Sequence, residues 1–288
     1  MLHFIYNPNA GGGSAERARQ AIEPMLRDVP HAFHATRERG DATAIARALT
    51  GAAGEADIVA MGGDGTLHEV LNGLRDPARA RLGLIPCGSG NDFAAVAGLP
   101  VDPAQALGVI LSGAAQYTDF MECAGVRGIN AIGTGIDVDI LRRYARMKRL
   151  KGSAAYLASL ILTVMTYVPR RFDEVTGGLC EPHEAFIACA ANGQRFGGGI
   201  PIAPKAAIDD GLLDVVIVDG IKKPAIPYAF ARLMQRRILD LKATVFKRQQ
   251  ALTVRSETPM PIQIDGEIYE DLPFDVRLIH GVLRFYRP

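Results

Sequence analysis

Paired cysteines, long apolar runs and excess charge of either sign are all scarce in this 288-residue sequence. The four cysteines are widely spaced and include no Cys-x-x-Cys pair, which argues against a zinc site or a disulfide framework and fits a reducing compartment. The formal net charge of +1 argues against a protein that coats nucleic acid with its whole surface. Because 48% of the residues are hydrophobic, the chain can still form substantial cores.

Export and membrane-spanning signals are also lacking. The first residues run into a short apolar stretch without a basic leader, so no export signal is expected. The longest apolar run, residues 154–168, contains Ser, Thr and Tyr and falls short of the roughly 20 residues that cross a bilayer. We therefore predict a cytoplasmic protein.

The first part of the chain, residues 1–118, alternates short β-like runs with helix-like segments. Four runs predict its strands: 3–6, 32–36, 58–61 and 82–85. Asp41 and Thr66 are placed to begin helices, which puts glycine-rich loops between strand ends and helix starts. This order of elements predicts a Rossmann-like α/β domain.

Residues 119–288 are richer in β-like runs and contain two helical stretches. Six runs predict strands: 186–191, 213–218, 252–255, 262–265, 276–279 and 282–286. No repeat or linker-like tract separates the two halves. We predict a second, β-rich and sandwich-like domain joined tightly to the first, with the substrates in the cleft between them.

Three glycine-rich loops follow predicted strands of the first domain: residues 7–14, 62–66 and 88–92. Glycine lets the backbone approach phosphate oxygens, and helix N-termini attract anions. In an open parallel sheet such loops meet at the carboxyl ends of the strands. One such loop is usually only a tight connection, but three in register predict that this domain binds a nucleotide.

Two carboxylates lie in these loops. Asp64 would repel phosphate unless a cation or ordered water separates them, so it predicts a Mg²⁺–nucleotide site. Asp92 can act there through water or can cap the helix that begins beside it, and the two roles are compatible.

These motifs together resemble the diacylglycerol kinase catalytic-domain superfamily, especially its soluble bacterial lipid-kinase branch. The resemblance covers nearly the whole chain and rests on Asn7-Pro8, Gly62-Gly63-Asp64-Gly65-Thr66, Gly88-Ser89-Gly90-Asn91-Asp92, Asn192-Gly193, Asp209-Asp210-Gly211 and Asp265-Gly266-Glu267. NAD kinases and phosphofructokinases share the second motif but do not combine it with the later ones.

The resemblance implies an ATP-dependent kinase that phosphorylates the hydroxyl of a diacylglycerol-like lipid in phospholipid biosynthesis. It implies that ATP and Mg²⁺ are held by Asn7, Gly11, Gly12, Gly13, Ser14, Thr36, Gly62, Gly63, Asp64, Gly65, Thr66, His68, Glu69, Ser89, Asn91 and Asp92. For His68, a partly buried helix position is the alternative. The chain departs from the family pattern at Asn9-Ala10, where Ser-Gly is common, and at Ser89, where Thr is common.

Asp265 and Glu267 form a carboxylate pair, two residues apart where a predicted strand enters a turn. A positioned carboxylate can accept the proton of an attacking hydroxyl, and the resemblance puts this pair at the catalytic base position. By pattern alone, Asp265-Gly266 is a plain hairpin turn. The sequence does not tell which carboxylate takes the proton.

The Asp209-Asp210-Gly211 segment reads as a turn between strands. The resemblance adds a structural magnesium site, with Asp210 contributing its side chain and Ala207 and Leu212 their backbone carbonyls.

Two stretches are rich in basic residues: Arg142, Arg143, Arg146, Lys148, Arg149 and Lys151 in the first, and Lys222, Lys223, Arg232, Arg236, Arg237, Lys242, Lys247 and Arg248 in the second. Such runs are often solvated helix faces. For a lipid kinase they also predict peripheral binding to anionic headgroups at the inner face of the membrane. No motif that reads nucleotide bases accompanies them, so no nucleic-acid partner is expected. The sequence does not decide whether the protein forms a homodimer.

Two other functions remain as alternatives. A kinase of a soluble acceptor, resembling NAD kinases, fits the first domain but not the β-rich second domain and its Asp-Gly-Glu motif. An inert regulator that binds a nucleotide or a membrane would be expected to lack a carboxylate or a loop, and none is missing.

Overall fold

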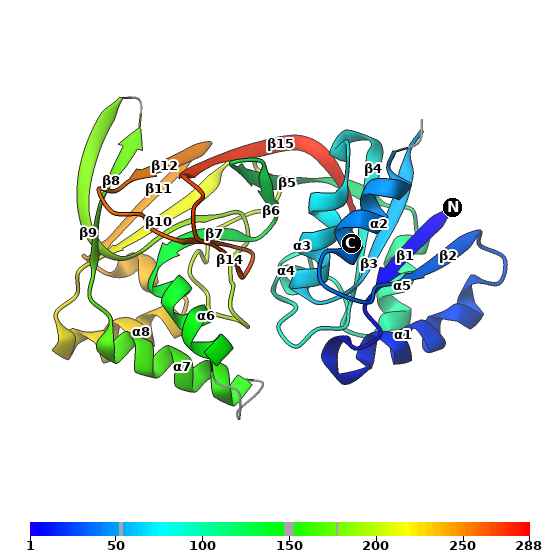
Figure 1. The fold of residues 1–288 in the computed structure, drawn as a ribbon, viewed down its shortest axis with the longest axis horizontal. Coiled ribbons are helices and arrows are strands. Elements are labelled where there is room, and N and C mark those ends of the chain that lie inside the picture. Colours follow the sequence, from blue (N-terminus) through cyan, green and yellow to red (C-terminus); the bar gives the residue numbers. More distant parts are fainter. Residues whose placement is uncertain (52–53, 147–152, 177) are drawn as a thin grey trace. The chain divides into compact units, whose positions relative to one another are not determined.

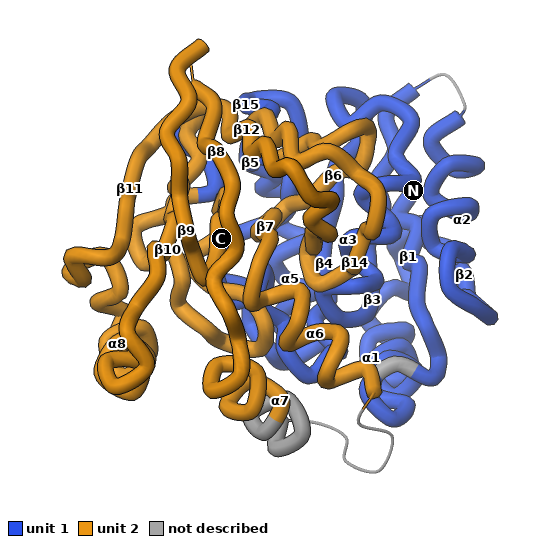
Figure 2. Tube along the Cα trace, turned by 60° about the vertical axis from the view of Figure 1, so that its left-hand side comes forward, with its two compact units in different colours: residues 1–120, 208–210, 279–288 blue, residues 121–207, 211–278 orange. Residues whose placement is uncertain are grey.

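The computed structural model describes residues 1–51, 54–146, 153–176 and 178–288, which form two compact units. Unit 1 contains residues 1–120, 208–210 and 279–288, and unit 2 contains residues 121–207 and 211–278 (Figure 2). The sequence-based division placed residues 208–210 and 279–288 in the second domain. The structure instead puts both segments in unit 1.

Unit 1 is built on a parallel sheet. Its main strands are β1 (Leu2–Tyr6), β2 (His31–Ala35), β3 (Ala56–Gly62) and β4 (Ala80–Pro86). They pair in the order β4-β3-β1-β2 (Figure 1). The end of β15 (Phe274–Tyr286) adds a further parallel strand beside β4. β3 and β4 are almost entirely buried, as expected for parallel strands with helices on both faces.

The helices of unit 1 are α1 (Ser14–Ile22), α2 (Asp41–Leu49), α3 (Asp64–Gly73), α4 (Asp92–Val96) and α5 (Pro103–Leu111). Helices α1 and α5 pack over a core that includes Phe4, Ile22 and Leu107. Helices α2 and α3 pack closely against each other, because a Cβ at Gly73 would lie 2.5 Å from the carbonyl oxygen of Thr43.

Unit 2 is a mostly antiparallel sheet with helices. It contains the end of β5 (Ala115–Cys123) and the beginning of β15. Its other strands are β6 (Val126–Gly128), β7 (Ala131–Gly135), β8 (Arg170–Thr176), β9 (Leu179–Ala191), β10 (Leu213–Asp219), β11 (Thr244–Gln249), β12 (Ala251–Arg255), β13 (Ile262–Ile264) and β14 (Glu267–Tyr269). The main path is β14-β13-β7-β9-β8-β12-β15, and β10 lies between β9 and β11.

The two faces of this sheet have separate cores. One core gathers Phe172, Leu252, Ile262 and their neighbours. The other involves the helices α6 (Ile136–Arg146), α7 (Ser153–Thr166) and α8 (Ile226–Met234), which pack against β-strand residues such as Phe186 and Val218. The predicted fold class, an α/β domain followed by a β-rich sandwich-like domain, is confirmed. In the described residues, no helix is long and apolar enough to cross a membrane.

Candidate functional site

The three glycine loops of unit 1 meet at the carboxyl edge of its sheet. They follow β1, β3 and β4, which are parallel neighbours. Gly11, Gly12 and Gly13 have φ values of 56°, 66° and 85°, a left-handed run that suits glycine and few other residues. The Ser14 hydroxyl donates a hydrogen bond to the Cys87 carbonyl at 2.6 Å, which ties the first loop to the end of β4.

The second and third loops touch through glycine. A Cβ placed on Gly88 would lie 2.5 Å from the Cα of Gly63, so position 88 requires glycine, and a Cβ on Gly63 would lie 3.1 Å from the Cα of Gly88, a tight contact. Asn91 closes the third loop with two hydrogen bonds to Gly88, since its Oδ1 accepts from the Gly88 N–H at 2.9 Å and its Nδ2 donates to the Gly88 carbonyl at 2.8 Å. The loops are therefore held in fixed, close positions before any ligand binds.

The Asp64 carboxylate lies against the start of α4. Its two oxygens accept hydrogen bonds from the N–H groups of Asp92 and Phe93, each at 3.1 Å. Asn91, and not Asp92, is the residue that precedes the helix, and it has a φ of 50°. Asp64 therefore joins the second loop to the third, and its predicted role toward a hydrated cation remains a prediction.

Glu69 on α3 holds the start of another helix, as Asp64 does. One of its carboxylate oxygens accepts hydrogen bonds from the N–H groups of Gly40 and Ala42, at 3.1 and 3.2 Å, at the start of α2. His68 is buried in the same helix, with its Nε2 3.4 Å from the Asn72 amide. The structure thus places both side chains in contacts within the protein, whereas their predicted role toward a nucleotide remains a prediction.

The remaining predicted residues of this region lie along the same edge. Asn7 follows β1 and its Oδ1 accepts a hydrogen bond from the Asn9 N–H at 2.9 Å. Thr36 is buried just after β2, and Ser89 is exposed in the third loop. Gly62 approaches Thr66 so closely that a Cβ would lie 2.2 Å from the Thr66 hydroxyl.

This edge fits the phosphates of a nucleotide. Helices α1 and α3 are preceded by Gly13 and Gly63, which have no side chain to cap the first N–H groups of the helix. Such groups bind anionic oxygens, and the positive end of each helix dipole favours negative charge.

In unit 2, the carboxylate pair sits on a hairpin. β13 and β14 are joined by Asp265 and Gly266, whose φ values of 50° and 91° are those of a tight type I′ turn. The Asp265 carboxylate accepts hydrogen bonds from the N–H groups of Ile129, Asn130 and Ala131 at 2.8–3.1 Å. Asp265 therefore fixes the segment that leads into β7. The hairpin and the motif with a predicted catalytic role are the same structure.

Glu267 is the first residue of β14, where it pairs with Ile264 and is half-buried. The two carboxylates thus have different surroundings, a distinction that the sequence did not reveal. Asp210 is exposed in the turn before β10. Its carboxylate and the carbonyls of Ala207 and Leu212 are oxygen donors of the kind that magnesium accepts, and the predicted metal site remains a prediction.

Several basic residues predicted to face a membrane are engaged in ion pairs. Lys247 Nζ lies 2.9 Å from Glu174 and 2.7 Å from Glu181, and Arg248 lies 3.1 Å from Asp214. His183 joins Glu174 and Glu181 in a group of three potential metal-ligating side chains that sequence reasoning missed. Lys148, Arg149 and Lys151 lie outside the described residues.

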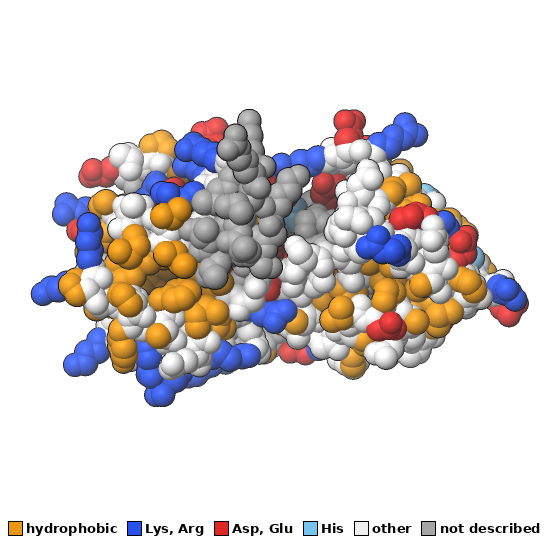
Figure 3. All heavy atoms as spheres, turned by 90° about the horizontal axis from the view of Figure 1, so that it is seen from below, with side chains coloured by type: hydrophobic (Ala, Val, Ile, Leu, Met, Phe, Trp, Pro, Cys, Tyr) orange, Lys and Arg blue, Asp and Glu red, His pale blue; other side chains and the backbone are white. Residues whose placement is uncertain are grey.

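Sequence reasoning also missed an apolar pocket in unit 2. It is a cavity of about 110 Å³ between α6, α7, α8 and the sheet. Its lining is aliphatic or aromatic, with residues such as Ile140, Val164, Phe186 and Phe230, except for Asp137. Figure 3 shows this side of unit 2, where apolar side chains surround a hollow and lysine and arginine side chains lie around them.

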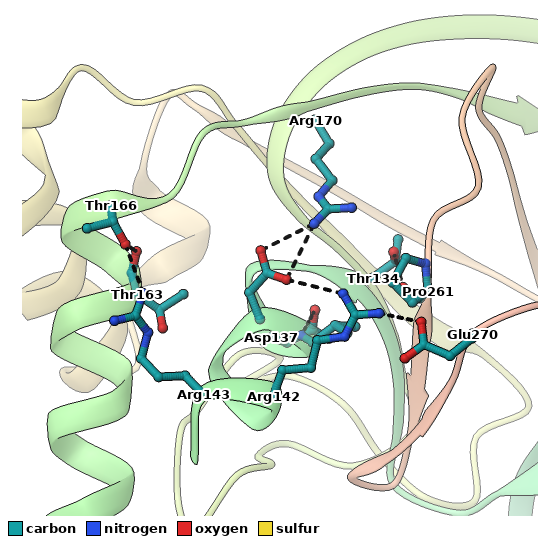
Figure 4. Close-up of polar contacts among 11 residues, drawn as sticks. Thr134, Asp137, Arg142, Arg143, Thr163, Thr166, Arg170, Pro261 and Glu270 are labelled. Atoms are coloured by element: carbon teal, nitrogen blue, oxygen red, sulfur yellow. Dashed lines mark hydrogen bonds and ion pairs between the residues drawn. The ribbon is translucent and has the colours of Figure 1, made fainter. Parts of the chain in front are cut away.

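Among the described residues that line this pocket, Asp137 is the single carboxylate, and it lies on α6 (Figure 4). Its Oδ1 accepts a hydrogen bond from the Val138 N–H at 2.9 Å. Its buried Oδ2 has no hydrogen-bond partner of good geometry in the described part of the chain. Burial raises the pKa of Asp137 to about 7, against the opposing effects of the Val138 N–H and the Gln263 amide. The signal in the sequence is a carboxylate between two apolar residues, Ile136 and Val138.

The raised pKa of Asp137 predicts a pH-dependent stability. Between the unfolded value of 3.8 and about 7, the folded protein keeps a proton that the unfolded chain has lost. Resistance to urea should therefore fall as pH rises from 5 to 7, by up to roughly 1.4 kcal/mol per pH unit from this group. Asp137→Asn should remove that slope, measured as the difference between the two unfolding curves at each pH.

Asp139→Asn is the matched control, because it removes a carboxylate from the same helix. Asp139 forms ion pairs with Arg142 and Arg170 and lies outside the apolar lining. This variant should keep the wild-type slope. Equal slopes for wild type and Asp137→Asn would show that Asp137 is ionised normally in the folded protein.

Comparisons with known proteins agree with this geometry. Residues 1–123 match the diacylglycerol kinase catalytic domain, and residues 130–287 match the YegS C-terminal NAD kinase beta sandwich-like domain. A protein named "Probable lipid kinase YegS-like" from Xanthomonas campestris is 34% identical, over 99% of this chain and 96% of its own length. Another of the same name from Chromohalobacter salexigens is 31% identical, over 97% and 91%.

Solved structures share the fold. A diacylglycerol kinase structure from Bacillus anthracis str. Sterne superposes with a TM-score of 0.75 at 22% identity, covering 100% of this chain and 96% of that chain. An NAD kinase from Archaeoglobus fulgidus in complex with ATP gives a TM-score of 0.53 at 12% identity, covering 100% and 94%. The resemblance read from the motifs is confirmed by the family matches, and the chain belongs to the YegS-like family of lipid kinases, with a diacylglycerol kinase catalytic domain.

Proposed function

We propose that the protein transfers the γ-phosphoryl group of ATP to the hydroxyl of a diacylglycerol-like lipid, with Mg²⁺ as cofactor. The observation that carries this proposal is the apolar pocket of unit 2 with one carboxylate in its wall. An acyl chain is stabilised by such a lining, whereas a dinucleotide or a sugar phosphate would leave its polar groups without partners.

The glycine loops of unit 1 supply the phosphate contacts in this proposal. The N–H groups at the starts of α1 and α3 bind phosphate oxygens, and the fixed contact between Gly63 and Gly88 holds the loops at one spacing. Mg²⁺, when bound, neutralises charge on the phosphates. Asp64 orients the hydrated cation while its hydrogen bonds to α4 keep its carboxylate in place.

The acceptor hydroxyl oxygen attacks the γ-phosphorus, and the bond between that phosphorus and the bridging oxygen of ADP breaks. The hydroxyl proton passes to a carboxylate of the Asp265–Glu267 pair. Asp265 already accepts three N–H hydrogen bonds, which favours Glu267 as the group that takes the proton and Asp265 as the residue that positions the hairpin.

A panel of acceptors tests this function. We expect labelled ATP and Mg²⁺ to phosphorylate detergent-dispersed diacylglycerol, with little or no product from NAD or a sugar phosphate. Ala229→Leu should narrow the apolar pocket and lower kcat/KM for a long-chain acceptor roughly tenfold or more, because overpacking and lost acyl contacts each cost free energy. A short-chain acceptor should be less affected.

Ala231→Leu is the control, since residue 231 lies on the same helix but is exposed and outside the pocket lining. Its kinetics should match the wild type with both acceptors. Phosphorylation of NAD in preference to every lipid would refute the proposed acceptor class. Equal losses with short and long chains in Ala229→Leu would show that the pocket does not hold the acyl chain.

A further inference from the structure

A second, polar pocket lies in unit 2 between α6 and the segment from the end of α7 to the start of β8. It has a volume of about 780 Å³. Four arginines line it: Arg142, Arg143, Arg146 and Arg170. Asp139 is the single carboxylate among the lining residues described.

Among the described residues, the four arginines of this pocket outnumber the two carboxylates that pair with them. Figure 4 shows Arg142 beside Glu270 and Arg143 beside Thr166. Arg142 pairs with Glu270 and lies 3.8 Å from Asp139, and Arg170 lies 3.3 Å from the same Asp139. Arg143 donates to the Thr166 hydroxyl at 3.2 Å, a neutral partner that joins α6 to α7. Within the described residues, neither Arg143 nor Arg146 forms an ion pair with a carboxylate. The pocket therefore carries surplus positive charge.

The pocket borders an exposed apolar row on α7. Ile161, Leu162 and Met165 are 51%, 47% and 62% exposed, and their helical spacing puts them on one side of α7. Val168, two residues beyond the end of α7, is 74% exposed. Val168 also lines the arginine pocket. About half or more of each of these apolar side chains is in water, although burial would stabilise it.

We propose that the arginine pocket binds the phosphate headgroup of an anionic phospholipid while the apolar row of α7 enters the membrane surface beside it. One guanidinium group can bind two phosphate oxygens through parallel hydrogen bonds. Helices that lie at a membrane surface bury their apolar side chains at the depth of the headgroups. This inference goes beyond the proposed reaction, because the bound phospholipid is an anchor and not the acceptor.

The apolar row argues for a bilayer and against free phosphate. Inorganic phosphate would satisfy the arginines but would leave Ile161, Leu162 and Met165 in water. An anionic bilayer satisfies both features at once. Phosphate ions should therefore compete poorly with vesicles for this surface.

Vesicle binding without ATP tests the inference independently of the kinase activity. The protein should bind vesicles of phosphatidylglycerol and phosphatidylcholine in a ratio of roughly 3:7 at about 0.1 M salt, and higher salt should release it. Each basic residue near such a surface strengthens binding about fivefold, so Arg143→Gln/Arg146→Gln should weaken binding roughly thirtyfold. Leu162→Gln/Met165→Gln should weaken it roughly tenfold or more.

Arg171→Gln/Arg277→Gln is the control for charge. Arg171 is the neighbour of Arg170 in sequence, yet it and Arg277 lie outside the pocket, in ion pairs with Glu184 and Glu122. Leu179→Gln is the apolar control, because Leu179 is 73% exposed on β9. Both controls should bind vesicles like the wild type, and circular dichroism should show that every variant is folded.

Three results would overturn the inference. Wild-type binding by Arg143→Gln/Arg146→Gln would mean that the arginine pocket does not contact the membrane. Equal weakening by the control pair would indicate general charge attraction. Full release by millimolar inorganic phosphate at constant ionic strength would make the pocket a site for free phosphate. Detergent-dispersed acceptor should still be phosphorylated by the folded Arg143→Gln/Arg146→Gln variant, and loss of that activity would count against the proposed reaction geometry and not against membrane binding.

Discussion

Replacing Asp64 with alanine is expected to lower Mg²⁺-dependent turnover of ATP by at least about a hundredfold while the protein stays folded. The carboxylate lies among the three glycine loops, where it is proposed to orient the cation, and it also holds the start of α4 through two N–H groups. Loss of that second role should cost about 1 kcal/mol, as for a typical helix cap. Steady-state kinetics and thermal melting of the same preparation measure both effects.

Asp102→Ala controls for the loss of a cap. The Asp102 side chain accepts a hydrogen bond from the Gln105 N–H at 2.9 Å at the start of α5, away from the glycine loops. The Asp102→Ala variant should lose a similar amount of stability, about 1 kcal/mol, and its turnover of ATP should be unchanged. If Asp64→Ala also kept its turnover, Asp64 would be a structural cap alone and the predicted magnesium site would lie elsewhere.

Replacing Asp265 with asparagine should lower both stability and turnover, whereas Glu267→Gln should lower turnover alone. Asparagine tolerates the φ of 50° at residue 265, so the backbone is not strained. Its amide, however, presents an NH₂ group to N–H donors of residues 129–131, and an unsatisfied buried donor costs roughly 1–3 kcal/mol. Glu267→Gln removes the proposed base, which is worth about a hundredfold or more in rate.

The affinity for ATP distinguishes a carboxylate pair that acts on the acceptor from a pair that belongs to the nucleotide site. Both variants should bind ATP with near-normal affinity, measured by calorimetry in the absence of acceptor, because the pair belongs to unit 2 and the glycine loops to unit 1. A collapse of ATP affinity would place the pair in the nucleotide site. Normal turnover in Glu267→Gln would indicate that Asp265, and not Glu267, accepts the hydroxyl proton.

The α/β part of the fold was readable from the sequence because its signals are local. Each of the first four strands is a short run with several apolar residues, three of the four are followed by a glycine loop, and all four are present. Several strands of unit 2 were missed for physical reasons. β8 and β11 carry many charged residues, β7 is rich in glycine, and β14 has only three residues. Their strand conformation is set by pairing with distant neighbours.

The parts of the candidate site that consist of loops could be predicted from the sequence. Residue type and spacing located the glycine loops and the Asp-Gly-Glu hairpin, but they did not reveal which backbone groups Asp64, Glu69 and Asp265 hold. The surroundings of Asp137 were out of reach for a related reason. Its pocket is assembled from α6, α7, α8 and β9, and no local pattern records which side chains meet there.

The sheet of unit 1 is completed by a strand, the end of β15, that is synthesised after the whole of unit 2. Phe285 and Tyr286 are buried in unit 1, where Phe285 packs edge-on against Phe93 and the Tyr286 hydroxyl donates to Asp57 at 2.7 Å. A ribosome makes residues 1–120 first, yet the β4 edge of their sheet stays unpaired until residues 279–288 emerge. Unit 2 is complete in sequence before that moment. Unit 1 therefore keeps an open strand edge until it is joined by a segment that is translated after the whole of unit 2.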